Sequence, residues 1–98
     1  RRTISVVTYM DMLAATTGIG ESYHAKRYIK DNMIEVIPIT DRISRRAALY
    51  MEYYGLCYGL SPRSALIGAT AYVEGLVLVS RWADFKTLPE LQIVPFPS

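Results

Sequence analysis

The clearest pattern of apolar and polar positions lies at residues 61–79, which predict a capped helix followed by a buried strand. Ser61 is a favoured N-cap residue, and Pro62 suits the first helical position because its missing N–H needs no partner there. Gly75 can adopt the left-handed conformation that ends a helix. The apolar run at 76–79 is typical of a strand that is covered on both faces. Together these features predict half of a parallel α/β unit.

Three further helices follow from apolar residues at helical spacing in the first part of the chain. Residues 4–15 and 21–32 predict two of them, and Ser5 is a plausible cap for the first, although its β-branched residues weaken that prediction. The third begins after Thr40, and we expect it to stop at Gly55, before a loop rich in glycine and tyrosine.

Short apolar segments at 33–39, 76–79 and 91–94 predict three strands that alternate with the helices. This order predicts one α/β domain, residues 1–98, with a small parallel sheet. The edges of so small a sheet would be exposed. The chain also begins Arg1-Arg2, without an initiator methionine. We therefore expect that an opening strand lies upstream and is missing here, and that another segment or chain completes the sheet.

Composition narrows the class of protein without assigning a function. With 98 residues, 51% of them hydrophobic and 20% charged, the chain is long enough for one globular domain with a modest core. A net charge of +2 is too small to indicate nucleic-acid binding. Its one cysteine excludes an internal disulfide framework and fits a reducing compartment, so we expect a cytoplasmic protein. No apolar run approaches the ~20 residues of a membrane span.

Four segments, residues 4–13, 34–40, 59–71 and 77–85, resemble the PIN-domain family in the right order and at its usual spacing. The resemblance is to the VapC-type toxins of bacterial and archaeal toxin–antitoxin pairs. The most specific segment runs through Ser64, where the family usually reads Asp-Ala-Leu-Ile-Ala-Ala-Thr-Ala. The resemblance implies a three-layer α/β/α fold around a small parallel sheet, with the opening strand missing from this chain.

The resemblance also implies Mg²⁺-dependent cleavage of RNA, by carboxylates that hold one or two cations on oxygen ligands. This chain departs from the family's set of acids. The first acid would lie upstream; Asp11 matches the second, which is usually Glu; and Ser64 replaces the third. Trp82 stands near the usual place of the fourth, where Asp84 is the only nearby carboxylate. We therefore predict Asp11 and Asp84 as the remaining metal ligands.

Losing an acid from a divalent-cation site should cost more than the roughly 10–100-fold that is typical of outer-shell ligands. We therefore predict that this chain cleaves RNA weakly or not at all. VapC-type toxins usually pair with themselves and with a small antitoxin, so the resemblance implies a homodimer, an antitoxin partner and an RNA substrate, and no membrane.

Each candidate site residue also has an ordinary structural interpretation. Asp11 is equally well explained as a solvated helix residue, and Asp84 as a cap of the turn that follows it. Ser64 is better explained as a first-turn residue that helps the helix cap than as a catalytic hydroxyl, since no histidine stands at general-base spacing. His24 is better explained as a surface residue than as a ligand, and Cys57 as inert packing.

Two groups of side chains suggest contacts with other molecules. Four tyrosines near the end of the third predicted helix indicate either a partly covered core face or a protein interface, and we favour the interface because the core is small. Basic residues on three predicted helices either line an RNA path or are scattered and solvated, and we favour the second explanation. The tyrosines are Tyr50, Tyr53, Tyr54 and Tyr58; the basic residues are Lys26, Arg27, Lys30, Arg42, Arg45, Arg46 and Arg63.

Three functions compete at this point. The first is a PIN-domain endoribonuclease toxin whose opening strand and first acid are not part of this chain. The second is a degenerate PIN module without catalysis that binds or dimerises. The third is an unrelated small α/β interaction domain. We favour PIN-domain nuclease ancestry with impaired catalysis, because the family segments occur in order while the acids are incomplete.

Overall fold

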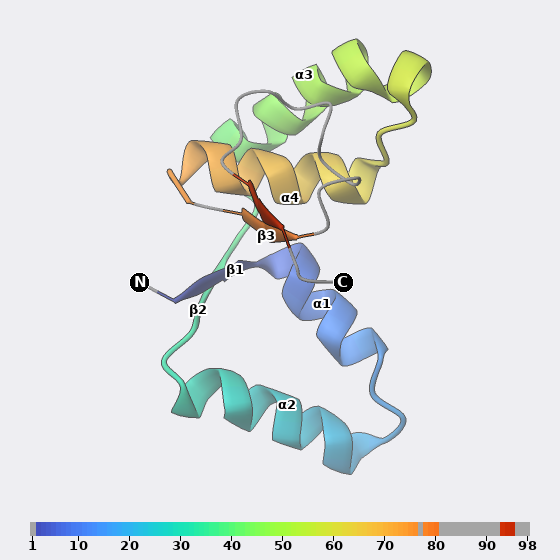
Figure 1. Cartoon of the computed structure of the whole chain (residues 1–98). Coiled ribbons are helices and arrows are strands. Elements are labelled where there is room, and N and C mark those ends of the chain that lie inside the picture. The colour runs from blue at the N-terminus through green and yellow to red at the C-terminus, as the bar shows by residue number, and fades with distance from the viewer. Residues whose placement is uncertain (1, 77, 81–92, 96–98) are drawn as a thin grey trace. The chain divides into compact units, whose positions relative to one another are not determined.

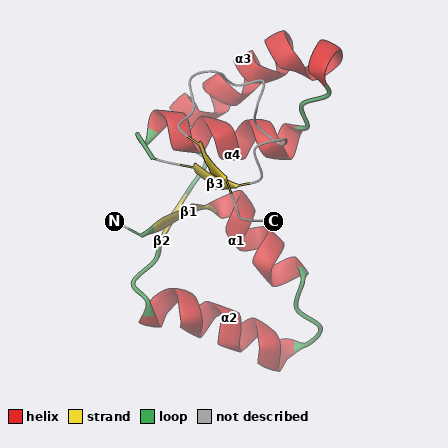
Figure 2. Cartoon of the chain, viewed as in Figure 1, coloured by secondary structure: helices red, strands yellow, loops and turns green. Residues whose placement is uncertain are grey.

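The computed structural model describes residues 2–76, 78–80 and 93–95, which belong to two compact units, Arg1–Pro38 and Ile39–Ser98. Each unit combines helices with one pair of short parallel strands (Figure 2). Helices combined with short parallel strands confirm the α/β class that the sequence predicts, with two strand pairs in place of one sheet. The described chain contains four strands, one more than predicted.

The first unit consists of a strand, two helices and a second strand. They are β1 (Thr3–Ser5), α1 (Val6–Ala14), α2 (Ile19–Asp31) and β2 (Glu35–Ile37). The two strands pair in parallel, with Ile4 opposite Val36, and the chain between them forms the two helices (Figure 1). Parallel strands require a crossover of this kind, because a tight hairpin can only join antiparallel strands.

The predicted helix at 4–15 is wrong at its beginning, because residues 3–5 form β1. Ser5 is nevertheless the N-cap, as predicted: its Oγ accepts a hydrogen bond from the backbone N–H of Val7 at 3.1 Å. Its side chain is buried, which suits a residue that ends a strand and starts a helix at the same position. The β-branched residues that weakened the helix prediction, Val6, Val7 and Thr8, nevertheless lie in α1, whereas Thr3 and Ile4 favour the strand.

The end of α2 is closed by a residue that is unusual for its conformation. Met33 has a φ of 54°, in the left-handed region that favours glycine. Its N–H donates to the carbonyl of Lys30 at 3.1 Å, and the N–H of Ile34 donates to the carbonyl of Ile29 at 3.0 Å. This is the Schellman arrangement of a helix C-terminus. It turns the chain from α2 into β2.

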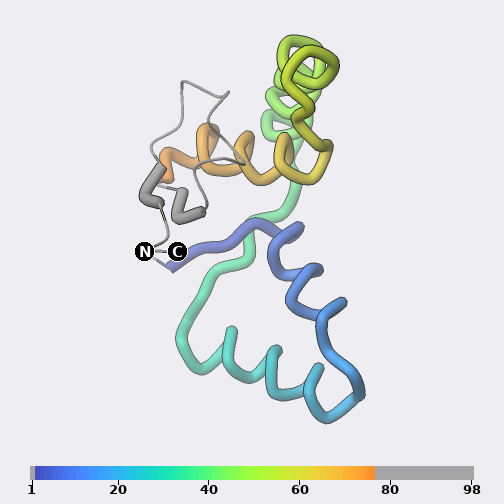
Figure 3. Tube along the Cα trace, turned by 45° about the vertical axis from the view of Figure 1, so that its right-hand side comes forward, coloured from blue at the N-terminus to red at the C-terminus, as the bar shows by residue number. Residues whose placement is uncertain are grey.

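The second unit contains two helices followed by two strands. They are α3 (Asp41–Tyr58), α4 (Pro62–Val73), β3 (Leu78–Ser80) and β4 (Ile93–Pro95). The strands pair in parallel, with Val79 opposite Val94, close to the strands predicted at 76–79 and 91–94. The helices α3 and α4 pack against each other, and Figure 3 shows them crossing.

The core of this helix pair joins larger side chains of α3 to small residues of α4. Ile43 is fully buried, and Tyr50 is only 2% exposed. The apolar face predicted for α3 is therefore confirmed at these positions. Small side chains on α4 let the two helices approach closely, because they leave no bulk between the backbones. The buried residues of α4 are Ala65, Ile67, Gly68, Ala69, Thr70 and Ala71.

The helix starts in this unit follow the predicted caps. The Oγ1 of Thr40 accepts from the N–H of Ile43 at 3.3 Å, and the Oγ of Ser61 accepts from the N–H of Ser64 at 3.1 Å. Pro62 occupies the first turn of α4, as predicted.

The predicted stop of α3 at Gly55 is wrong. The helix continues through this residue to Tyr58 and ends before Gly59, whose φ of 69° is left-handed. A single glycine inside a helix costs only about 1 kcal/mol, which the packing of the long helix can offset. Gly75, by contrast, does follow the end of α4 with a φ of 65°, as predicted. None of the helices in the described residues is long and apolar enough to cross a membrane.

Candidate acidic site

Asp11 lies in the last turn of α1, where it is half-buried. Its backbone carbonyl accepts a hydrogen bond from the N–H of Ala15 at 3.1 Å, at the C-cap of the helix. A carboxylate close to a helix C-terminus faces the negative end of the helix dipole, and α1 has no basic residue in that turn. The dipole of α1 therefore does not favour the negative charge of Asp11.

Ser64 occupies the first turn of α4 and is also half-buried. Its backbone N–H donates to the Oγ of Ser61, which confirms that the residue belongs to the capping turn. The helix N-terminus favours a negative charge at this place, yet the first turn of α4 contains no acidic residue. Because Ser64 is neutral, the first turn of α4 lacks a carboxylate that the helix dipole would stabilise.

The predicted site residues fall in different parts of the chain. Asp11 belongs to the first unit and Ser64 to the second, while Asp84 and Trp82 lie outside the described residues. Within the described ranges, no three His, Cys, Asp or Glu side chains are grouped so that they could hold a metal ion. Because Mg²⁺ requires several oxygen ligands in near-octahedral geometry, the described residues alone do not fit such a cation.

The carboxylate of Glu21 is hydrogen-bonded at the N-terminal end of α2. The hydroxyl and the backbone N–H of Thr17 both donate to Oε2 of Glu21, the latter at 2.8 Å. These two hydrogen bonds keep the pKa of the Glu21 carboxyl below its usual value of 4.5, and the bond from the hydroxyl has the larger effect. This glutamate serves the helix start, where Gly18 has no side chain with which to cap.

Along α2, a chain of polar contacts links three exposed side chains at intervals of four residues. Nη1 of Arg27 donates to the hydroxyl of Tyr23 at 3.2 Å, and Nε of Arg27 donates to Oδ2 of Asp31 at 3.4 Å. The ring of Tyr23 also meets His24 edge to face, at 5.9 Å between centroids. The sequence prediction missed this chain of contacts, although the i, i+4 spacing of the three residues could have indicated it. His24 is exposed, as predicted.

The basic residues divide between the two units. Lys26, Arg27 and Lys30 are exposed on α2. In the second unit, Arg42 and Arg45 are exposed on α3. Arg46 is half-buried there. Arg63, at the start of α4, is exposed.

The predicted tyrosine cluster exists along α3. The rings of Tyr50, Tyr54 and Tyr58 follow one another at 6.4 Å and 5.9 Å between centroids, from the buried core outward. Tyr53 and Leu56 lie outside this row and are 67% and 99% exposed. Contiguous exposed aromatic and aliphatic side chains of this kind are typical of protein contacts.

Cys57, expected to be packed, is exposed instead. The expectation was wrong because it placed this residue in an apolar, tyrosine-rich loop after the end of the helix. The helix α3 continues to Tyr58 and carries the side chain of Cys57 on its surface.

The family model of the PIN domain matches residues 2–91 of this chain. No curated protein sequence matches the chain. The match spans nearly all of the sequence, and it includes Asp11, Ser64 and Asp84.

Solved structures with the same fold come from toxin–antitoxin systems. A chain of a toxin–antitoxin complex from Klebsiella pneumoniae is 25% identical with a TM-score of 0.68, covering 94% of this chain and 71% of that one. VapBC2 from Rickettsia felis, solved bound to a DNA fragment from its promoter, is 17% identical with a TM-score of 0.69. That match covers 95% of this chain and 73% of that one. VapBC-5 from Mycobacterium tuberculosis is 18% identical with a TM-score of 0.65, and the match covers 94% of this chain and 79% of that one. At 17% and 18% identity the last two show the fold alone.

Proposed function

Because the chain belongs to the PIN domain family, we propose that it is the toxin of a VapC-like toxin–antitoxin pair, descended from a Mg²⁺-dependent endoribonuclease and itself weak or inactive in RNA cleavage. The likeness to three toxin–antitoxin proteins supports the toxin role. The family's general dependence on a metal ion supports the ancestry.

The observation that carries the proposal of weak catalysis is the neutral side chain at position 64. Ser64 lies in the first turn of a helix whose N-terminus would favour a carboxylate, and it supplies a hydroxyl without charge. A divalent cation that sheds its waters reluctantly needs several anionic oxygens to displace them. Asp11 and Asp84 remain as the proposed ligands, and two monodentate carboxylates are a weak set for Mg²⁺.

An antitoxin protein is the proposed partner. The support is that the similar structures include a toxin–antitoxin complex and two VapBC proteins. We also propose that two copies of this chain pair through the exposed side chains Leu49, Tyr53, Leu56 and Tyr58 of α3, since burial of Leu56 and Tyr53 would remove a large apolar area from water.

A second candidate function is a PIN-like module that binds or dimerises without any catalysis. The exposed tyrosines and leucines of α3 support it, because exposed apolar side chains of this kind are typical of protein contacts, although the toxin role needs such a surface as well. The two candidates differ in one measurable respect: only the first predicts residual cleavage that depends on Asp11.

Cleavage should be measured on a labelled RNA with Mg²⁺ and Mn²⁺ titrations. We expect slow cleavage or none, and we expect Asp11→Ala to abolish any that is found. Glu52→Ala, at an exposed glutamate of α3, is the control and should change nothing. Rapid turnover that Asp11→Ala abolishes would contradict impaired catalysis, and slow cleavage that Asp11→Ala abolishes would exclude the module without catalysis.

Pairing through α3 should be measured by light scattering during size-exclusion chromatography. Leu56→Asp should convert a dimer to a monomer, because it places a charge in the apolar contact. Ala48→Asp, at an exposed alanine of the same helix, should leave the dimer intact. A wild-type chain that is monomeric at all concentrations would exclude this contact.

A further inference from the structure

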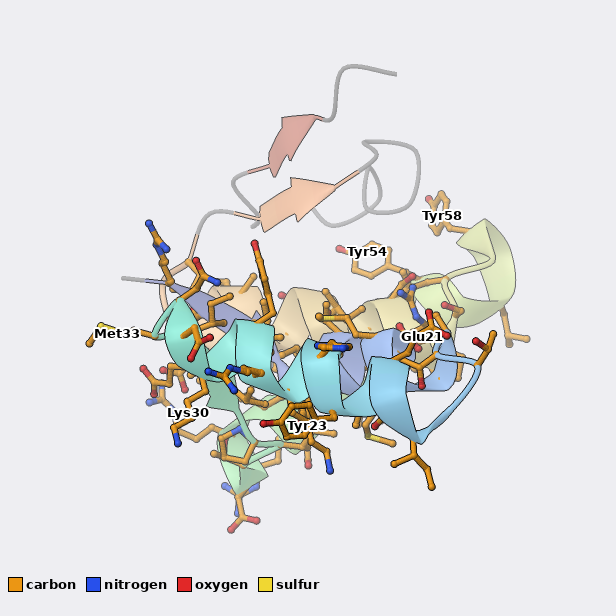
Figure 4. The ribbon with its side chains drawn as sticks, turned by 90° about the horizontal axis from the view of Figure 1, so that it is seen from below. Glu21, Tyr23, Lys30, Met33, Tyr54 and Tyr58 are labelled. Atoms are coloured by element: carbon orange, nitrogen blue, oxygen red, sulfur yellow. The ribbon has the colours of Figure 1, made fainter. Side chains whose placement is uncertain are left out.

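One face of α2 combines an exposed aromatic ring with exposed cations. Tyr23, Lys26, Arg27 and Lys30 follow the i, i+3, i+4, i+7 spacing that places side chains on one side of a helix. All four are exposed, whereas Ile29 on another side of the helix is buried. Figure 4 shows Tyr23 and Lys30 along the same edge of α2. We call these four residues the α2 basic face.

The ring of Tyr23 is held in place but left open to solvent. Arg27 fixes its hydroxyl at 3.2 Å, and His24 meets its ring at 5.9 Å between centroids. The residue is nevertheless 57% exposed. An aromatic ring that is held in one position loses little conformational entropy when a flat ligand stacks on it. Its exposure gives no benefit to the folded chain by itself.

The two lysines of this face have no acidic partner within the described part of the chain, and they stand one helical turn apart. Like charges at i, i+4 destabilise a helix by a few tenths of a kcal/mol. Arg27 differs, because Asp31 already partly neutralises it at 3.4 Å. Lys26 and Lys30 are therefore the positions where a bound anion would bring the largest gain.

We propose that the α2 basic face binds single-stranded RNA, with a base stacked on Tyr23 and backbone phosphates at Lys26 and Lys30. Single strands are bound by this combination of stacking rings and cations. A second copy of this chain would bring like charges together, and an acidic peptide would satisfy the lysines without requiring the open ring. The inference rests on the proposed function, because the proposed substrate is the RNA, and it adds a binding surface apart from the acidic residues.

The test measures binding of a short fluorescent oligouridine by anisotropy, in EDTA so that no metal-dependent cleavage occurs. Tyr23→Ala should weaken binding about tenfold, the size expected for the loss of one stacked base. The double variant Lys26→Gln/Lys30→Gln should reduce the slope of log affinity against log salt by about 1.4, or about 0.7 for each lost phosphate contact. Tyr23→Phe keeps the ring and loses only the contact of the hydroxyl with Arg27, so it should bind more tightly than Tyr23→Ala does.

Matched controls lie on α3, where similar residues are also exposed. Tyr53→Ala removes an exposed tyrosine, and Arg42→Gln/Arg45→Gln removes two exposed cations. We expect neither to change the affinity or the salt slope. Circular dichroism and thermal unfolding of every variant show whether the fold is kept.

Three outcomes would overturn the inference. The first is failure of the wild type to bind oligouridine at low salt. The second is weakening of binding by the α3 controls to the same extent as by the α2 variants. The third is competition by polyglutamate as strong as that by RNA, which would indicate an acidic protein partner. Because binding is measured without metal, it is separable from the proposed function. Rapid Asp11-dependent cleavage would refute impaired catalysis and leave this surface standing, whereas unaffected binding by the α2 variants would refute only this surface.

Discussion

The guanidinium of Arg46, on α3, lies over the ring of Tyr72, on α4, with its Cζ 4.4 Å from the ring centroid. This contact joins the two helices beside their apolar core, at a position where Tyr72 is still 41% exposed. A cation above a partly exposed aromatic ring contributes about 0.5–1 kcal/mol. The contact therefore helps to orient α3 and α4 relative to each other, in addition to the close packing that the small residues of α4 allow.

The first prediction tests this pair by a double-mutant cycle. Arg46→Ala, Tyr72→Leu and the double variant should show a coupling free energy of about 0.5–1 kcal/mol in urea unfolding. Arg45→Ala, at the exposed neighbouring arginine, combined with Tyr72→Leu should show none. A coupling energy near zero for Arg46 and Tyr72 would mean that the contact does not stabilise the helix pair.

The second prediction concerns the left-handed residue after α2. The left-handed conformation raises the free energy of a residue with a side chain by roughly 1–2 kcal/mol, whereas glycine has no such cost. Glycine instead loses more conformational entropy on folding. Met33 is 86% exposed, so its side chain contributes little burial. Met33→Gly should therefore stabilise the chain, by about 0.5 kcal/mol.

Thermal and urea unfolding measure this effect. The control is Met10→Gly, at an exposed methionine inside α1, which should destabilise by about 1 kcal/mol because it places glycine in a helix interior. If Met33→Gly destabilises as much as the control does, the φ of 54° at Met33 is not a source of strain.

The helix caps and helix faces were largely predictable, because their causes are local. Ser5, Thr40, Ser61 and Gly75 all have the predicted capping roles, since each acts on backbone groups within a few residues. The strand β1 was not predictable from periodicity, because its stability comes from pairing with β2, more than thirty residues later.

The candidate site was predictable only in its residue types. A family resemblance identified Asp11 and Ser64, and the structure places each in a defined turn of a helix. Contacts between elements, such as that of Arg46 with Tyr72, depend on how helices cross and leave no pattern along the chain. At Gly55 a local pattern predicted a helix end that does not form. The helix α3 continues through this glycine and ends before Gly59, which has the left-handed conformation.

The third prediction concerns the pH dependence at the start of α2. Since the folded-state pKa of Glu21 is lowered below its usual value of 4.5, the carboxylate stabilises the fold above pH 4.5. That contribution is lost as the pH falls through the folded-state pKa. Thr17→Val removes the hydroxyl, the larger cause of the lowered pKa, and keeps the N–H, so the pKa should rise part of the way back.

Carbon-detected NMR titration of the Glu21 carboxyl measures this pKa directly. Thr16→Val is the control, since the hydroxyl of Thr16 donates to the carbonyl of Leu13 at 2.7 Å and not to Glu21. An unchanged Glu21 pKa in Thr17→Val would show that the hydroxyl contact does not form in solution.

The fourth prediction reverses the defect proposed for the acidic site. Ser64→Asp restores a carboxylate in the first turn of α4, where the helix dipole favours it by about 0.3–1 kcal/mol. The variant should therefore unfold at higher urea concentration than the wild type. Under the proposed function it should also bind Mn²⁺ more tightly and cleave RNA faster in Mg²⁺, because it adds one anionic oxygen ligand.

Two variants separate these effects. Ser64→Asn has the shape of aspartate without its charge, so it should give neither the added cleavage nor the added Mn²⁺ affinity. Under the proposed function, adding Asp11→Ala to Ser64→Asp should abolish the gain in cleavage and keep the gain in stability, because the proposed metal site needs both residues whereas the helix start needs only residue 64. If Ser64→Asp raises stability but leaves Mn²⁺ affinity and cleavage unchanged, the position influences the helix alone, and the missing acid is not the reason for weak catalysis.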